Sequence, residues 1–202
     1  MIKQKTQVNE ENTFFVIENL SKSYEQLEVL KNFSLSLTAP GTYCLMAPSG
    51  SGKTTLLRIL LGLEKADNGY IKIPQPVRAV FQENRLCESF SPLDNVFLAA
   101  DSSMNRQSIY TELTRILPKD SILRPVSTLS GGMKRRAAIA RALLAPSKTI
   151  VMDEPFTGLD EETKQTVIDY VKEKTVGKYL LVTTHLEEEA MALNGTIIRL
   201  NL

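Results

Sequence analysis

The stretch that decides the fold of this chain reads Pro48-Ser49-Gly50-Ser51-Gly52-Lys53-Thr54-Thr55. A short apolar run at residues 42–46 precedes it and predicts a strand, and residues 53–61 carry the apolar spacing of a helix. A strand, a glycine-rich turn and a helix that opens on Gly-Lys-Thr form the context that a phosphate-binding loop requires. Glycines let several backbone N–H groups point at one spot, where the helix dipole adds partial positive charge. The stretch therefore predicts a nucleoside triphosphate site.

Each residue of this loop has an expected role. Lys53 is expected to reach the β- and γ-phosphates, and the Thr54 hydroxyl to bind Mg²⁺. The other expected ATP-binding residues of the loop are Ser49, Gly50, Ser51, Gly52 and Thr55. The motif opens with glycine, whereas this chain has Ala47, and alanine resists a positive φ. Phosphate binding should survive if Ala47 merely ends the strand, and should weaken if the turn needs glycine torsions there.

Outward from the loop, strands alternate with helices. Strands are expected at residues 13–20, 30–37, 42–46, 70–73, 77–81, 149–152, 179–183 and 196–200. Helices are expected at residues 53–61, 92–100, 106–117, 131–145, 160–174 and 186–193. Such alternation implies a parallel sheet covered on both faces. The strand-free middle of the chain reads as a helical subdomain inserted into that sheet.

Two carboxylates close the apolar strand at residues 149–152. A buried parallel strand ends at the carboxyl edge of its sheet, where open α/β folds bind ligands. Asp153 is therefore expected to hold Mg²⁺ through water, and Glu154 to orient and deprotonate an attacking water. His185 is the only histidine of the chain, and it follows another predicted strand. If the two strands are neighbours, His185 can hydrogen-bond the γ-phosphate.

A second anion-binding helix start precedes the acidic strand. It reads Leu129-Ser130-Gly131-Gly132-Met133-Lys134-Arg135-Arg136. Ser130 is a natural helix N-cap, and the two glycines leave the amides of the first turn uncovered. This stretch is similar to the signature sequence of ABC ATPases, and the chain resembles that family from about residue 13 onward. The resemblance implies an α/β, P-loop NTPase (RecA-like) parallel sheet with N-terminal antiparallel strands. It implies one ABC ATPase domain, with a core at residues 1–82 and 146–202 and a helical signature subdomain at 83–145.

The resemblance assigns further residues. Gln82 looks like the Q-loop glutamine, which contacts ATP and senses Mg²⁺, and His185 matches the switch histidine of the catalytic site. Tyr24 lies where the family places an aromatic that stacks on adenine; the alternative is an ordinary core or surface tyrosine. In a head-to-tail dimer of this family, Ser130, Gly131, Gly132 and the D-loop residue Asp160 contact the ATP that is held by the other chain.

Two signature positions depart from the family. Met133 replaces the commoner glutamine, and Arg135 replaces another frequent glutamine. Neither position supplies the serine or glycine amides, so little effect on closure around ATP is expected.

The function implied by the resemblance is ATP hydrolysis that drives a membrane permease, with ATP and Mg²⁺ as cofactors. Partners would be a second copy or a paired ABC subunit, integral-membrane permease subunits and a substrate-binding protein. The segments at residues 82–86 and 92–96 look like those of import ATPases for nitrate, sulfonates and taurine. The alternatives are a non-transport ABC ATPase that acts on a membrane complex of the cell-division type, or one that acts on DNA or ribosomes.

Composition narrows these alternatives. The formal charge of +1 gives no electrostatic case for a nucleic-acid partner. Apolar stretches are too short to span a bilayer, and residues 1–12 are polar and unlike a signal peptide. Together with the permease partner that the resemblance implies, these features give an expected location that is cytoplasmic, peripheral on the inner face of the cell membrane. Cys44 and Cys87, far apart, indicate two reduced, buried thiols. The sequence stops soon after its last strand, so control through an appended domain is not expected.

Overall fold

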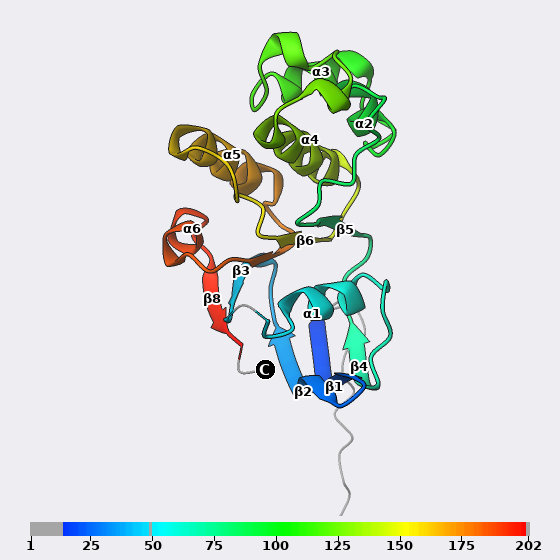
Figure 1. Ribbon diagram of the computed structural model, residues 1–202, viewed down its shortest axis with the longest axis vertical. Helices are drawn as coiled ribbons and strands as arrows, with labels where there is room; N and C mark the ends of the chain where they lie inside the picture. Colours follow the sequence, from blue (N-terminus) through cyan, green and yellow to red (C-terminus); the bar gives the residue numbers. More distant parts are fainter. Residues whose placement is uncertain (1–13, 49, 201–202) are drawn as a thin grey trace, which may run out of the picture.

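The computed structural model describes residues 14–48 and 50–200, which form two sheets (Figure 1). Within this part of the chain, a parallel sheet has the order β5-β6-β7-β3-β8, and an antiparallel sheet has the order β2-β1-β4. The strands are β1 (Phe15–Tyr24), β2 (Leu27–Leu37), β3 (Gly41–Met46), β4 (Asn68–Lys72), β5 (Val77–Val80), β6 (Thr149–Asp153), β7 (Tyr179–Thr183) and β8 (Thr196–Arg199). The predicted parallel sheet and the N-terminal antiparallel strands are confirmed.

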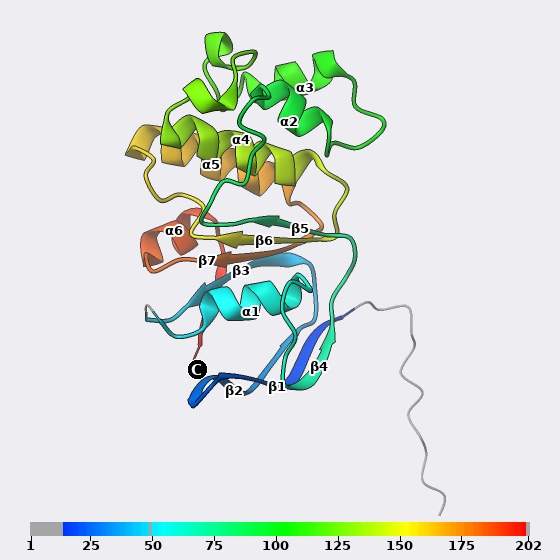
Figure 2. The same ribbon diagram turned by 45° about the vertical axis from the view of Figure 1, so that its right-hand side comes forward.

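Helices cover the parallel sheet on both faces. They are α1 (Lys53–Leu60), α2 (Pro92–Phe97), α3 (Arg106–Leu113), α4 (Gly131–Leu144), α5 (Glu161–Lys174) and α6 (Glu187–Ala192), with short 3₁₀ turns η1 (Lys119–Ser121) and η2 (Val126–Thr128). Figure 2 shows α1 between the two sheets, with α4 and α5 on the opposite face of the parallel sheet.

Alternating side chains of the central strands enter two separate cores. In β6, Val151 packs with α1 and the antiparallel sheet, whereas Ile150 and Met152 pack with α4 and α5. In β7, Leu181 faces the α1 side in the same way. A strand that is buried on both faces reads as a continuous apolar run, as residues 149–152 do. The two cores fix β6 and β7 side by side, so that their carboxyl ends meet at one edge of the sheet.

The segment between β5 and β6 contains helices joined by loops, and the structure describes all of it. Residues 81–148 fold into α2, α3, the two 3₁₀ turns and α4 and contain no strand. Ser91 caps α2 in a capping box with Asp94, and Asn105 caps α3. In Figure 1 α2, α3 and α4 lie together at the end of the molecule opposite the antiparallel sheet.

Several predicted elements have different bounds in the structure; for example, the strand expected at 30–37 begins at Leu27, and the helix expected at 92–100 ends at Phe97. The first strand was expected to end at Leu20 but runs to Tyr24, because register shifts after Ile17 and Leu20 break its two-residue periodicity while pairing with β2 continues. The helix expected at 106–117 ends at Leu113, five residues before Pro118. Beyond Leu113 the chain tightens into turns, with hydrogen bonds from Arg115 N to Glu112 O and from Ile116 N to Leu113 O.

The two cysteines lie in different surroundings. Cys44 on β3 is buried, and burial raises the pKa of its thiol to about 11. Cys87 is exposed, so the expectation of a second buried thiol was wrong. Its position in a loop beyond the strand β5 explains the difference.

No helix among the described residues is long and apolar enough to pass through a bilayer.

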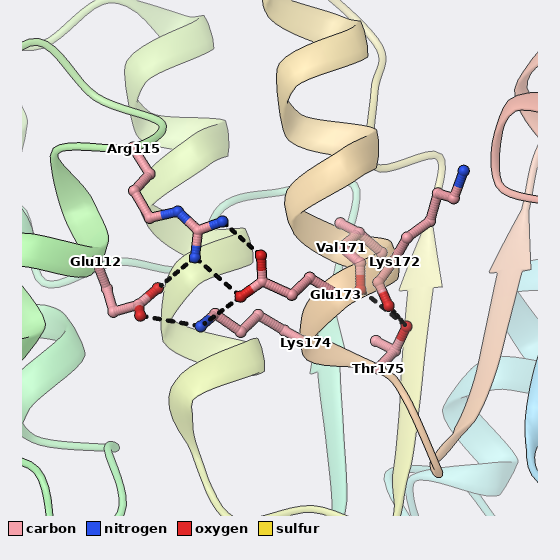
Figure 3. A network of polar contacts seen from close by, with 7 residues as sticks. All are labelled: Glu112, Arg115, Val171, Lys172, Glu173, Lys174 and Thr175. Carbon is pink, nitrogen blue, oxygen red and sulfur yellow. Dashed lines mark hydrogen bonds and ion pairs between the residues drawn. The ribbon is translucent and has the colours of Figure 1, made fainter.

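A network of charged side chains connects α3 to α5 (Figure 3). Arg115, just beyond α3, donates to both carboxylate oxygens of Glu173, at 3.0 and 2.5 Å, and to Glu112 at 3.3 Å. Lys174 Nζ lies 2.9 Å from Glu112 Oε1 and 3.1 Å from Glu173 Oε1. The helical segment is thus tied to the end of α5 by alternating positive and negative groups.

Candidate functional site

The glycines of the predicted phosphate loop are required by backbone geometry. Gly50 and Gly52 have φ of 80° and 86°, a conformation that side chains disfavour. A Cβ on Gly52 would also lie 2.7 Å from Cγ1 of Val29. Gly52 is the N-cap of α1 and leads the chain directly from the turn into the helix. Ser49, another expected ATP-binding residue, lies outside the described residues.

Lys53 is buried at the start of α1. Its Nζ donates to the carbonyl oxygens of Ala47 at 2.7 Å and Pro48 at 2.9 Å. The ammonium group is therefore held over the loop itself, where an incoming phosphate can compete with two neutral acceptors for a charged donor. Ser51 Oγ is buried nearby and has no hydrogen-bond partner among the described residues.

Ala47 follows the last residue of β3. Its backbone lies outside the left-handed region, and its side chain packs against the core around α1. Of the two possibilities raised by the sequence, the structure has the one in which this position merely ends the strand. The positive torsions of the turn belong to Gly50 and Gly52.

The acidic strand end and the phosphate loop meet directly. Asp153 is buried at the end of β6, and Thr54 Oγ1 on α1 donates to its Oδ2 at 3.0 Å. Thr183 Oγ1, from the neighbouring strand β7, donates to the other oxygen at 2.5 Å. Two hydroxyls therefore orient a single carboxylate. Oxygen ligands of this kind suit Mg²⁺, which is bound by few protein groups and keeps phosphate and water as its other ligands.

Glu154 stands beside this pair in a strained backbone conformation. Its φ is 43°, which is uncommon for a residue with a side chain. Its N–H donates to both the carbonyl oxygen and the hydroxyl oxygen of Thr183, each at 3.1 Å, and these bonds hold the turn. His185 Nδ1 lies 3.6 Å from Glu154 Oε1, and 62% of the histidine side chain is exposed. The structure therefore brings the two expected catalytic residues together.

One cavity of about 410 Å³ collects most of the expected nucleotide-binding residues. Its described lining is Val29, Gly50, Gly52, Lys53, Thr54, Thr55, Gln82, Asp153 and Glu154. Val29 was missed by sequence reasoning, because nothing in strand periodicity marks which apolar residue faces a ligand.

Tyr24, at the end of β1, lies outside the lining of this cavity, and its hydroxyl donates to Glu64. Adenine stacking by Tyr24 stays a prediction.

The second turn that was predicted to bind an anion has the predicted N-cap, but it lies outside the lining of this cavity. Ser130 caps α4 by accepting from Met133 N at 3.3 Å. Around Gly131 the structure is open, with no atom within 4 Å of where a Cβ would sit. Asp160 caps α5 by accepting from Thr163 N at 2.9 Å, a bond that holds the pKa of its carboxyl below the usual value. Nucleotide contacts of these residues stay predictions.

Arg135 has surroundings that sequence reasoning did not foresee. Instead of pointing to solvent from α4, its guanidinium is buried against the carbonyl oxygens of Phe81 and Gln82. The spacing of apolar residues along α4 cannot reveal these contacts of Arg135, because its partners are backbone groups of a distant loop.

Comparison with known proteins places these features in a family context. The profile of the ABC transporter family matches residues 30–157. A spermidine/putrescine import ATP-binding protein of Acetivibrio thermocellus is 31% identical over 95% of this chain and 60% of its own length. An aliphatic sulfonates import ATP-binding protein of Pseudomonas syringae pv. tomato is 34% identical over 90% of this chain and 68% of its own length. The chain thus spans about three fifths of the polyamine-import relatives that it matches.

Solved structures have the same fold. A dimeric structure of MJ0796, described as a bacterial ABC transporter cassette, matches with a TM-score of 0.82 and 27% identity, over 92% of this chain and 94% of that one. A second dimeric structure of MJ0796, in a post-hydrolysis state with bound ADP and Pi, matches with a TM-score of 0.80 over the same shares.

Proposed function

The chain belongs to the ABC transporter family, and from this premise we propose that it binds and hydrolyses ATP with Mg²⁺ in the cavity beside α1. One observation carries the proposal: Thr54 and Asp153, 99 positions apart, are hydrogen-bonded to each other in the cavity that Lys53 and Glu154 also line. A phosphate-binding amine, oxygen ligands for a metal and a carboxylate base are the groups that phosphoryl transfer to water requires.

The residues divide this work. Lys53 exchanges its bonds to Ala47 and Pro48 for bonds to the β- and γ-phosphates. Thr54, Asp153 and Gln82 would hold Mg²⁺, which when bound would neutralise charge on the phosphates. Glu154 accepts a proton from the attacking water, while His185, close to its carboxylate, donates to the γ-phosphate.

Paired variants test this division. Lys53→Ala should weaken ATP binding at least about tenfold, because a charged hydrogen-bond donor is lost. Glu154→Gln should keep ATP binding and lower kcat roughly 10²- to 10³-fold, as expected for loss of a general base. Calorimetric titration and phosphate release measure the two quantities. Lys72→Ala and Glu18→Gln are matched controls at exposed strand positions. Near-normal turnover by Glu154→Gln would remove Glu154 from this role.

The wider activity is coupling to a membrane permease. Relatives at similar identity are named for import of spermidine/putrescine and of aliphatic sulfonates, and these names support an importer of a small solute. Import of nitrate, sulfonate or taurine remains one hypothesis within that class, because polyamine-import relatives match equally well. The subunit would sit on the inner face of the cell membrane and work with permease subunits and a substrate-binding protein.

Copurification from detergent-solubilised membranes tests the partner. Recovery of integral-membrane subunits with the tagged chain supports transport coupling. Recovery of DNA-binding or ribosomal proteins instead would favour a non-transport ABC ATPase.

A further inference from the structure

Arg135 joins the first turns of α4 to the loop that follows β5. Its side chain is 6% exposed, and its two terminal nitrogens donate to the consecutive carbonyl oxygens of Phe81 and Gln82, the second at 2.6 Å. The planar fork of a guanidinium can serve two neighbouring acceptors at once, which an ammonium group does less well. The contact thus fixes the orientation of the peptide group between these two residues.

The same helix holds the other end of this loop. Arg141, two turns further along α4, donates to the carbonyl oxygen of Arg85 at 2.8 Å and to that of Asn84 at 3.4 Å. The Arg85 guanidinium lies 3.8 Å above the ring of Phe81, which closes the segment on itself. Residues 81–85 are therefore attached to α4 at both ends rather than only through the chain.

The buried guanidinium contacts a residue of the nucleotide cavity. Burial lowers the pKa of Arg135, and the charge of Asp153 opposes that shift. Arginine stays charged at such sites. A buried charge needs partners, and the hydrogen-bond partners that the structure gives Arg135 are the two carbonyls, one of which belongs to Gln82 in the cavity lining.

We propose that Arg135 is a positioning residue that makes the Ser130–Gly132 turn and the Gln82 backbone one rigid unit. Arg135 lies in the turn of α4 that directly follows Gly132, so any rotation of α4 moves both elements together. Gln82 then reaches the bound nucleotide only when α4 is in place. The expected effect of Arg135 on ATP hydrolysis rests on the proposed function. The physical connection between α4 and the Gln82 backbone rests only on the hydrogen bonds of Arg135.

Three variants, measured in the full chain, test the link. Arg135→Met removes both hydrogen bonds and the charge. Arg135→Lys keeps the charge but lacks the planar guanidinium group. Arg124→Met is the control. Arg124 also donates to a backbone carbonyl, that of Thr128 at 3.3 Å, but outside the nucleotide cavity. NMR relaxation gives order parameters for the Gln82 and Asn84 backbone N–H groups, and steady-state assays at varied Mg²⁺ give kcat and KM.

In Arg135→Met, the order parameters should fall from about 0.85 to below about 0.6, the values of rigid and flexible backbone. The kcat should fall roughly 10- to 100-fold, as expected for a misplaced group, while ATP affinity without Mg²⁺ changes less than about twofold. Arg135→Lys should be intermediate in both, and Arg124→Met should match the native chain.

Unchanged order parameters in Arg135→Met would overturn the proposal, as would an equal change in Arg124→Met. If Arg135→Met does not fold, Arg135→Lys decides: native order at Gln82 overturns the link, and reduced order supports it. A native chain without ATPase activity would refute the proposed function, whereas the order parameters would still test the positioning role.

Discussion

Residue 47 shows how one side chain can depart from a motif without changing its geometry. The methyl group of Ala47 packs against the core around α1, and the carbonyl oxygen accepts from Lys53 at 2.7 Å. Both features need only a strand-like backbone, which alanine adopts as easily as glycine. Among the described residues of the turn, Gly50 and Gly52 are the ones with positive φ.

Ala47→Gly should therefore leave ATP affinity almost unchanged, by less than about 1 kcal/mol, the usual scale of a glycine backbone effect. Folding stability should fall by about 1 kcal/mol, because glycine gains chain entropy in the unfolded state and the packed methyl group is lost. Calorimetric titration and denaturant unfolding measure the two quantities. A tenfold gain in affinity would show instead that alanine strains the loop.

Most of the site could be predicted from the sequence, because phosphate loops and acidic strand ends are local patterns with a fixed place in the sheet. Lys53, Thr54 and Asp153 meet as expected, since the loop and β6 both lie at the carboxyl edge. Val29 and Arg135 could not be predicted. The role of Val29 depends on the approach of β2 to Gly52, and the role of Arg135 depends on the carbonyls of a loop 53 residues away. Neither contact produces a periodic pattern in the sequence.

At the scale of elements, the charged network between α3 and α5 holds the helical segment against the core. The hydrogen bond from Arg115, and then that from Lys174, lower the pKa of Glu173 to about 2. A carboxyl with a lowered pKa in the folded state stabilises the fold above its unfolded pKa of about 4.3. That stabilisation is lost as pH falls from there through about 2.

Glu173→Gln should therefore lower the melting temperature near pH 7, and the difference from the native chain should shrink as pH falls below about 4. High salt should also shrink it, because Arg115 and Glu173 are both partly exposed and their attraction is screened. Scanning calorimetry over pH and salt measures this. Glu161→Gln, which breaks a pair within one helix, is the control. A difference independent of pH would point to lost packing rather than charge.

Element boundaries were harder to predict than element types. The alternation that marks residues 13–20 as a strand stops where the register shifts begin, although pairing with β2 continues to Tyr24. A bulge moves side chains to the other face of a strand without ending it. The central strands β6 and β7 were predicted nearly to the residue, because both of their faces are buried and their apolar runs have clear ends.

At the scale of the whole molecule, the chain carries two helix starts that are predicted to bind anions, and the nucleotide cavity is lined by residues of only the first. The turn at Ser130 lies outside the lining of that cavity, and the structure around Gly131 is open. The helical segment, tied to α5 by the charged network and to the loop after β5 by Arg135, holds α4 in this position. A single copy would then be an incomplete active site, with the turn at Ser130 available to the nucleotide of a second copy.

This arrangement predicts that ATP drives dimerisation of the Glu154→Gln variant, in which bound ATP persists. Adding Ser130→Arg places a long cationic side chain on the capping position of α4, which removes the N-cap oxygen and blocks the approach of phosphate to the helix start. The double variant should stay monomeric while each copy still binds ATP. Adding Ser36→Arg instead, at an exposed position on β2, should leave dimerisation intact. Sedimentation velocity with and without ATP distinguishes these outcomes, and a Ser130→Arg double variant that dimerised normally would place the second anion-binding turn outside the shared site.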